Sequence, residues 1–231
     1  MRAIKAIFIK QTKDMLKNFS VLIMFILYPL VALVMTELVA GRMEGLPQGM
    51  FTNMMSSIFV GMSLIMSAAG VIAEDRENKS LRFLVIAGVK PYSYLLGIGG
   101  VIFTASLFTT VAFGFIGRFN PCEFLAFTVI MLSGSIASII LGATIGIFSN
   151  NQQAASGLSM PFAIIFGFGP MIAMFNEQVE KVLRFFYTYQ ISVIVNDFSA
   201  GVMKPLTVIW VNIAVLSVLF AFAYKKKGLR N

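Results

Sequence analysis

The sequence predicts an all-α integral membrane protein with six transmembrane helices, an N-terminal interfacial amphipathic helix, and short outer helices between spans five and six. Of the 231 residues, 58% are hydrophobic and 12% are charged; this charged share is about half that of an average soluble domain. Charge-free runs cover most of the chain, at 18–36, 45–73, 91–117, 124–176 and 205–224. A bilayer crossing needs about 20 mostly apolar residues. The longest run, interrupted by the polar SNNQQ at 149–153, therefore holds two spans.

The charge-free runs set the expected order of segments along the chain. We expect spans at 19–40, 51–73, 94–116, 124–148, 157–175 and 206–224. A helix at 1–18 precedes them, a charged loop at 74–91 joins spans two and three, and a basic tail follows at 225–231. Pro29 lies near the middle of span one, where the missing amide proton and the ring should kink the helix.

Lysine and arginine are distributed unevenly between the two sides of this arrangement. An even number of spans places both termini on one side, together with loop 74–91, and that side holds 13 of the 18 bases but only four acids. Cytoplasmic loops are enriched in Lys and Arg, so both termini and loop 74–91 are expected in the cytoplasm. The net charge of +8 then follows from topology, and no nucleic-acid partner is needed to explain it.

Residues 2–17 have the pattern of an amphipathic helix. At about 100° per residue, one arc carries apolar side chains: Ile4, Ile7, Phe8 and Met15. The opposite arc carries bases: Arg2, Lys10, Lys13 and Lys17. Such a helix lies in the membrane interface, with its apolar face in lipid and its lysines toward anionic headgroups or a cytoplasmic partner. The alternative is a positively charged flank that is helical without a binding role.

Span four carries small residues at four-residue spacing: Gly134, Ser138, Gly142 and Gly146. Small side chains on one helix face let two helix backbones approach closely. The stripe is therefore a packing surface, either inside a single bundle or at the seam of a dimer.

The segment between spans five and six, 176–204, is mixed in character. EQVEKVLRFFYTYQ at 177–190 combines charges with aromatic residues, which favour headgroup depth. ISVIVNDF at 191–198 is apolar but too short to cross a bilayer. We expect one or two short interfacial or re-entrant helices at the outer membrane face.

Loop 74–91, with the sequence EDRENKSLRFLVIAGVKP, is the main candidate functional segment. Three acids and four bases surround the apolar patch 81–89, whereas the flanking segments are long and uncharged. We expect the loop to contact a partner outside the bilayer through charged and apolar side chains: Glu74, Arg76, Glu77, Leu81, Phe83 and Leu84. A solvated turn that anchors two helices is the alternative.

Several kinds of chemistry are excluded by residues that the sequence lacks. It has no histidine, only one cysteine (Cys122), and no GxxxxGK[ST] phosphate loop, so we expect no catalytic, cofactor or metal site and no ATP bound by this chain. No charged residue lies in the middle of an expected span, unlike in ion-coupled carriers. The chain is therefore not expected to be an enzyme, and transport powered by another subunit fits best.

The stretch IAEDRENKSLRFLVIAGVKPYSYLLG at 72–97 resembles the loop between spans two and three of type-2 ABC transporter permeases, the membrane subunits of ATP-binding-cassette exporters. The matching residues are Arg76, Glu77, Ser80, Leu81, Leu84, Leu95, Leu96 and Gly97. NNQQAASGLSMPF at 150–162 and GFGPM at 167–171 are similar to later segments of that family. The sequence departs from the family at three positions: Lys79 replaces a frequent glycine, Arg82 a glutamate and Ile98 a lysine.

This resemblance implies a division of labour. A separate cytoplasmic ABC ATPase subunit would bind and hydrolyse ATP, and loop 74–91 would be the coupling helix that docks on it. A second permease copy, identical or similar, would complete a path lined from spans one, two and five in a bacterial plasma membrane in contact with membrane lipid. The cargo would be amphipathic or hydrophobic: a drug, an antimicrobial peptide or a lipid. Two other functions stay open, a substrate-capture membrane subunit of a vitamin importer and a membrane immunity or sensor protein.

Overall fold

The computed structural model describes residues 2–40 and 49–227, and these residues form helices without any strand. Within them, six helices are long and apolar enough to cross a membrane: Val21–Val39, Met50–Glu77, Tyr92–Ile116, Pro121–Phe148, Gln152–Ala173 and Met203–Lys226. The predicted fold class, an all-α protein with six membrane-spanning helices, is confirmed.

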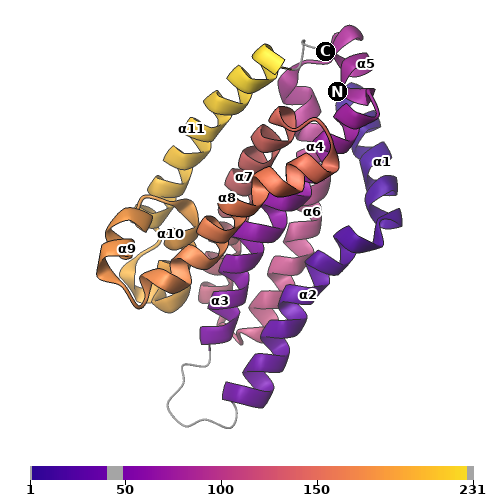
Figure 1. Ribbon diagram of the computed structural model, residues 1–231. Coiled ribbons are helices and arrows are strands. Elements are labelled where there is room, and N and C mark those ends of the chain that lie inside the picture. Colours follow the sequence, from indigo (N-terminus) through magenta and orange to yellow (C-terminus); the bar gives the residue numbers. More distant parts are fainter. Residues whose placement is uncertain (1, 41–48, 228–231) are drawn as a thin grey trace.

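The helices follow the predicted order (Figure 1). The N-terminal helix is α1 (Arg2–Lys17), and the spans are α2 (Phe19–Met35) with η1 (Thr36–Ala40), α3 (Met50–Ile58) with η2 (Phe59–Ser63) and α4 (Leu64–Glu77), α6 (Pro91–Ile116), α7 (Pro121–Phe148), α8 (Gln152–Ala173) and α11 (Met203–Lys227). The short α5 (Ser80–Ile86) joins α4 to α6, and α9 (Glu177–Leu183), α10 (Tyr187–Asn196) and η3 (Phe198–Ala200) join α8 to α11.

Some boundaries differ from the sequence-based expectation. The second span continues as helix to Glu77, so the first acids of loop 74–91 belong to the last turn of α4. Pro29 lies inside α2, which continues past it to Met35. The expected basic tail at 225–231 begins as part of α11, and residues 228–231 lie outside the described residues.

One end of the bundle gathers the start of α1, the whole of α5 and the end of α11 (Figure 1). We call this end the α5 end. Helices α9 and α10 lie on the opposite side of the bundle from α1. Of these two, α10 is largely buried, with Tyr187 and Ile191 fully inaccessible, whereas Val182 on α9 is exposed. The segment between α8 and α11 therefore contains one surface helix and one helix packed into the bundle.

The small-residue stripe of α7 packs inside the chain. All four members, Gly134, Ser138, Gly142 and Gly146, are buried. A Cβ atom at position 142 would lie 2.3 Å from the carbonyl oxygen of Ile65, and one at position 146 would lie 2.7 Å from that of Ala69. The hydroxyl of Ser138 bonds the carbonyl oxygen of Val60 at 2.6 Å. These contacts place the stripe against the second span of the same chain, so it offers no free surface for a dimer seam.

The apolar face of α1 also packs against protein. Ile7 is buried and sits over Gly97 of α6, where an added Cβ would lie 2.6 Å from its Cγ2 atom. Phe8 covers Gly100 in the same way, with a corresponding distance of 3.3 Å. Ile7 is therefore covered by protein, whereas Phe8 is partly buried and also lines an open apolar groove between α1, α2 and α6. Because glycines remove the side chains beneath them, α1 approaches α6 closely instead of resting only in the interface.

Candidate functional site

Loop 74–91 folds as a short helix between two tight turns. After α4, Asn78 caps the helix and Lys79 adopts a positive φ of 59°, which turns the chain into α5. After α5, Gly88 with φ 75° turns the chain again, and Pro91 begins α6 at a position that its fixed φ suits. Glycine adopts a positive φ without a steric penalty, whereas a lysine is strained there.

The strain at Lys79 leads to a first prediction. Lys79→Gly should raise the free energy of unfolding by about 1 kcal/mol, because a residue with a Cβ pays about 1–2 kcal/mol in the left-handed region. The thermal unfolding midpoint of the purified chain in detergent measures this. The same change at Lys13, inside α1, should lower stability by about 1 kcal/mol, since glycine weakens a helix interior. A loss of stability at position 79 as well would contradict the turn geometry.

Arg76 stabilises the end of the fourth span. Its guanidinium donates one hydrogen bond to the carbonyl oxygen of Ile147 and another, of 3.0 Å, to that of Ser149. Both carbonyls belong to the C-terminal turn of α7, where helix geometry leaves acceptors without intrahelical donors and the helix dipole is negative. The arginine therefore caps α7 from the neighbouring helix.

Two acids of the same turn hold the start of the fifth span. A carboxylate oxygen of Glu77 accepts a 3.1 Å hydrogen bond from the backbone N–H of Gln152, and Glu74 accepts one of 2.9 Å from the Gln152 side-chain amide. Gln152 begins α8, where free N–H groups and the helix dipole favour negative charge. Glu74, Arg76 and Glu77, which we call the loop brace, thus join the last turn of α4 to the connection between α7 and α8.

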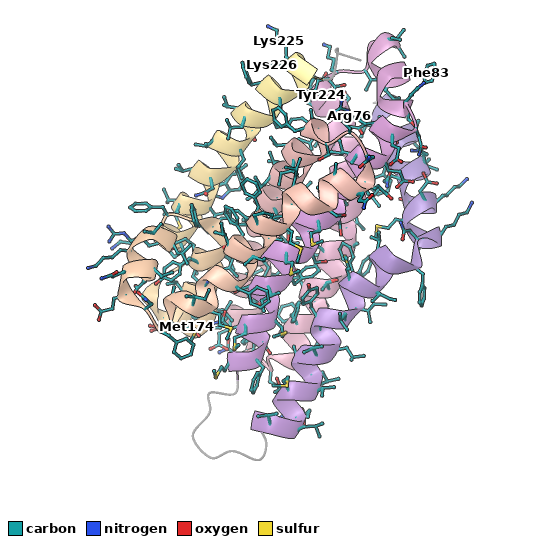
Figure 2. All side chains as sticks on the ribbon, viewed as in Figure 1. Arg76, Phe83, Met174, Tyr224, Lys225 and Lys226 are labelled. Atoms are coloured by element: carbon teal, nitrogen blue, oxygen red, sulfur yellow. The ribbon has the colours of Figure 1, made fainter. Side chains whose placement is uncertain are left out.

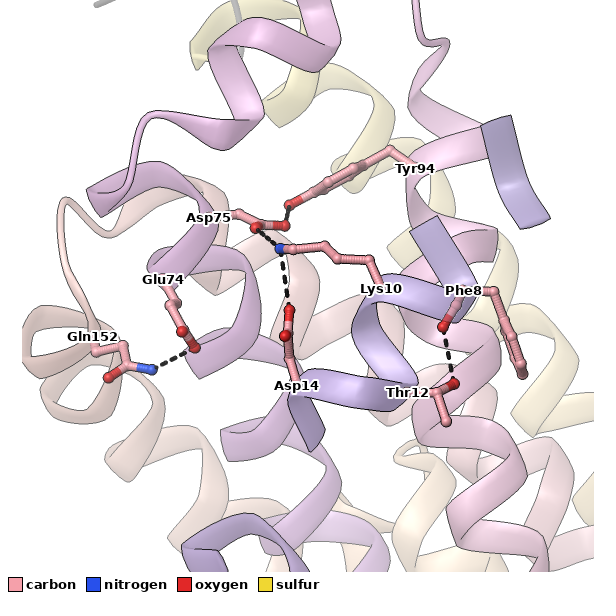
Figure 3. A network of polar contacts seen from close by, with 8 residues as sticks. All are labelled: Phe8, Lys10, Thr12, Asp14, Glu74, Asp75, Tyr94 and Gln152. Atoms are coloured by element: carbon pink, nitrogen blue, oxygen red, sulfur yellow. Dashed lines mark hydrogen bonds and ion pairs between the residues drawn. The ribbon is translucent and has the colours of Figure 1, made fainter. Parts of the chain in front are cut away.

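Asp75 points to the other side of α4 (Figure 3). Its side chain is 7% exposed and lies 2.8 Å from the ammonium of Lys10, while its second oxygen accepts a 3.0 Å hydrogen bond from the hydroxyl of Tyr94. Lys10 also lies 3.5 Å from Asp14, within α1. The network therefore joins α1, α4 and α6 at the α5 end.

The charge of Lys10 is retained in this network. Partial burial by itself lowers the pKa of Lys10, but the hydrogen bond and charge of Asp75, with a smaller contribution from Asp14, outweigh it and raise the pKa above its usual 10.5. Because the pKa of Lys10 is higher in the folded state than in the unfolded state, the ion pair stabilises the fold at neutral pH. This contribution is lost as the pH rises through the folded-state pKa of Lys10.

Among the described side chains of α5, two large apolar ones are exposed. Phe83 is 70% exposed and Ile86 is 72% exposed, whereas Leu84 is partly buried against the core. Figure 2 shows Phe83 at the tip of the α5 end, with Arg76 deeper in the molecule. The side chain of Leu81 lies outside the described residues. Exposed large apolar side chains at a bundle end that is otherwise charged are typical of a protein-docking surface.

The predicted loop residues therefore separate into two groups. The first group, Glu74, Arg76 and Glu77, forms hydrogen bonds to other parts of the chain. In the second group, Phe83 is exposed and Leu84 packs against the hydrophobic core. The sequence reasoning missed Lys10, Asp75 and Tyr94. One signal was present: continuing the helical phase of the buried Ala68 and Ile72 by one turn places Asp75 on the same buried face. No comparable pattern pairs Lys10 or Tyr94 with it.

Comparison with known proteins places this geometry in a family. Residues 36–224 match the model of the ABC-2 family transporter proteins. This range includes the last five spans and, of the first span, only η1, because α2 ends at Met35. Comparison with curated proteins gave no match. The family model covers most of the chain, including α5 and the loop brace. The chain therefore belongs to the ABC-2 family of transporter proteins and is a membrane subunit of an ABC transporter.

Proposed function

We propose that this chain is the permease subunit of an ATP-driven exporter of a bacterial plasma membrane, with both termini and α5 in the cytoplasm. A separate ABC ATPase subunit binds and hydrolyses ATP, and α5 is the helix that docks on it. The observation that carries this proposal is the exposed apolar pair Phe83 and Ile86, held at the end of the bundle by a helix with tight turns on both sides. The bias of Lys and Arg toward this end supports its cytoplasmic placement.

The loop brace connects the docked helix α5 to the membrane-spanning helices. A movement of α5 displaces the last turn of α4. The hydrogen bonds of Arg76 and Glu77 transmit this displacement to the end of α7 and the start of α8. Asp75 passes it to α1 through Lys10 and to α6 through Tyr94. In this proposal, ATP-driven closure of the ATPase pair moves several spans together, instead of only the two that flank the loop.

Two permease copies, identical or similar, complete the transport path in this proposal. The exposed faces of α2 and α8 support it, since both present large apolar side chains outward, among them Ile26 and Leu30 on α2 and Phe162 and Ile165 on α8. Such surfaces suit contact with a second permease, with lipid or with an amphipathic or hydrophobic cargo. Export, instead of import, rests on the family resemblance of loop 74–91.

The docking role of α5 is tested with a double variant, Phe83→Asp with Ile86→Asp. The tagged chain is purified from its native membranes, and copurified ATP hydrolysis is measured while mass spectrometry identifies any subunit with a phosphate loop. We expect the native chain to recover an ABC ATPase and the aspartate variant to lose at least about nine-tenths of it, because a desolvated apolar contact is replaced by buried charge.

A conservative double variant, Phe83→Leu with Ile86→Val, is the matched control and should retain the ATPase because the surface stays apolar. Thermal unfolding of all three proteins checks that the exposed substitutions leave the fold intact. Equal recovery of the ATPase by the aspartate variant would show that α5 is not the docking helix. Absence of any ABC ATPase from the native preparation would overturn the proposed function itself.

A further inference from the structure

A polar groove lies at the α5 end between the α1–α2 junction, α4 and α8. It consists of two adjoining cavities of about 420 Å³ and 400 Å³ that share Asn18, Val21, Val71 and Glu74. The remaining lining residues are Met24, Met66, Ser67, Gly70, Gln152, Gln153 and Ser156 in the first, and Gln11, Asp14, Met15, Lys17 and Phe19 in the second. A volume in this range suits a drug-sized molecule.

The groove contains a carboxylate without a counter-ion. Glu74 accepts a hydrogen bond from the uncharged amide of Gln152, and it forms no ion pair within the described part of the chain. Two neighbouring bases are engaged elsewhere: Arg76 donates to carbonyls of α7, and Lys10 lies closest to Asp75. Asp14 and Lys17 also line the groove, so the lining carries two acids and one base. A partly desolvated carboxylate of this kind favours a cation.

The wall of the groove also contains a buried hydroxyl without a hydrogen-bond partner, that of Ser67. Ser67 is 5% exposed and lines the first cavity, and its hydroxyl has no hydrogen-bond partner in the described structure. Buried hydroxyls are nearly always paired, because an unpaired one loses about 1–3 kcal/mol relative to water. Among the described lining residues, Ser67 thus adds a buried and unpaired hydroxyl to the wall of the first cavity.

Part of the lining is apolar and adaptable. Met24 and Met66 come from α2 and α4, and Val21 and Val71 lie beside them. Methionine side chains adjust their shape to different apolar ligands. A ligand of this groove therefore needs both a positive charge, for Glu74, and an apolar body, for the methionines.

We propose that this groove binds amphipathic organic cations, with Glu74 facing the positive charge and Met24 and Met66 facing the apolar body. The inference rests on the proposed transport function, in which the groove receives cargo from the cytoplasmic side. It narrows the cargo class from amphipathic or hydrophobic molecules in general to those that carry positive charge.

The sign of the charge is tested with two ions of matched shape, tetraphenylphosphonium and tetraphenylborate. The full chain is reconstituted in lipid nanodiscs, and equilibrium binding of each ion is measured against empty nanodiscs of the same lipid. We expect saturable binding of tetraphenylphosphonium only, with Glu74→Gln weakening it roughly tenfold, the loss of about one close charge interaction. The glutamine keeps an acceptor for Gln152, so the α8 connection is retained.

Two further variants locate the site. Ser67→Leu places a larger side chain in the cavity and should abolish binding, while Glu177→Gln, an exposed acid at the start of α9, should leave it unchanged. Equal binding of both ions, no saturable binding of the cation, or unchanged binding by Glu74→Gln would each overturn the inference. Recovery of an ABC ATPase is measured separately, so a chain that docks the ATPase but binds no cation refutes only the cargo class. A chain that binds the cation but recovers no ATPase refutes the proposed function.

Discussion

Gly142→Ala is expected to destabilise the chain by about 3 kcal/mol, although it adds one methyl group to a helix. The added Cβ would lie 2.3 Å from the carbonyl oxygen of Ile65 and 2.9 Å from the Cβ of Ala68. Backbone atoms cannot rotate away as a flexible side chain can, so α4 and α7 have to separate. Overpacking of this kind typically loses about 1–3 kcal/mol, and a backbone contact belongs at the upper end.

The matched control for this prediction is Gly157→Ala in α8. A Cβ at position 157 meets no atom within 4 Å, so helix propensity alone decides the outcome and should add up to about 1 kcal/mol of stability. Unfolding free energies from denaturant titration in mixed micelles compare the two variants. A stabilising effect of alanine at both positions would contradict the close approach of α4 to α7.

Asp75→Ala is expected to lose about 3 kcal/mol of stability, since it removes the shared acceptor of two helices. The hydroxyl of the fully buried Tyr94 would be left without its partner, at a loss of about 1–3 kcal/mol. The ion pair with Lys10 adds about 1 kcal/mol or less, because the Lys10 side chain is 53% exposed and water screens it.

Conservative variants separate these two contributions. Asp75→Asn keeps an acceptor for Tyr94 but removes the charge, so it should lose only about 1 kcal/mol. Asp14→Asn, whose carboxylate is 49% exposed and 3.5 Å from Lys10, should be close to neutral. The same titration measures all three variants. Equal losses for alanine and asparagine at position 75 would show that the ion pair, instead of the Tyr94 hydrogen bond, dominates the network.

Hydropathy was sufficient to predict the all-helical fold class and the six spans, because both depend on local composition. Runs of apolar residues long enough for a bilayer give helices whatever their neighbours are, since a backbone in lipid has to satisfy its own hydrogen bonds. The turns on either side of α5 were partly predictable from the residue types as well. Gly88 and Pro91 fit the turn and helix start that the structure contains, and Lys79, at a position where the resembling family often has glycine, lies in the left-handed conformation.

The sequence alone determined that this protein is an all-helical membrane protein with most of its lysines and arginines in the termini and loop 74–91. Only the tertiary structure decided which partner each polar side chain has. Lys10 meets Asp75 across 65 positions, and Arg76 meets the carbonyl of Ser149 across 73. It also placed Gly142 and Gly146 against α4, and Gly134 and Ser138 against η2 and α10. The physical reason is that lipid and protein interior are equally apolar, so hydropathy does not reveal which face of a span contacts another helix.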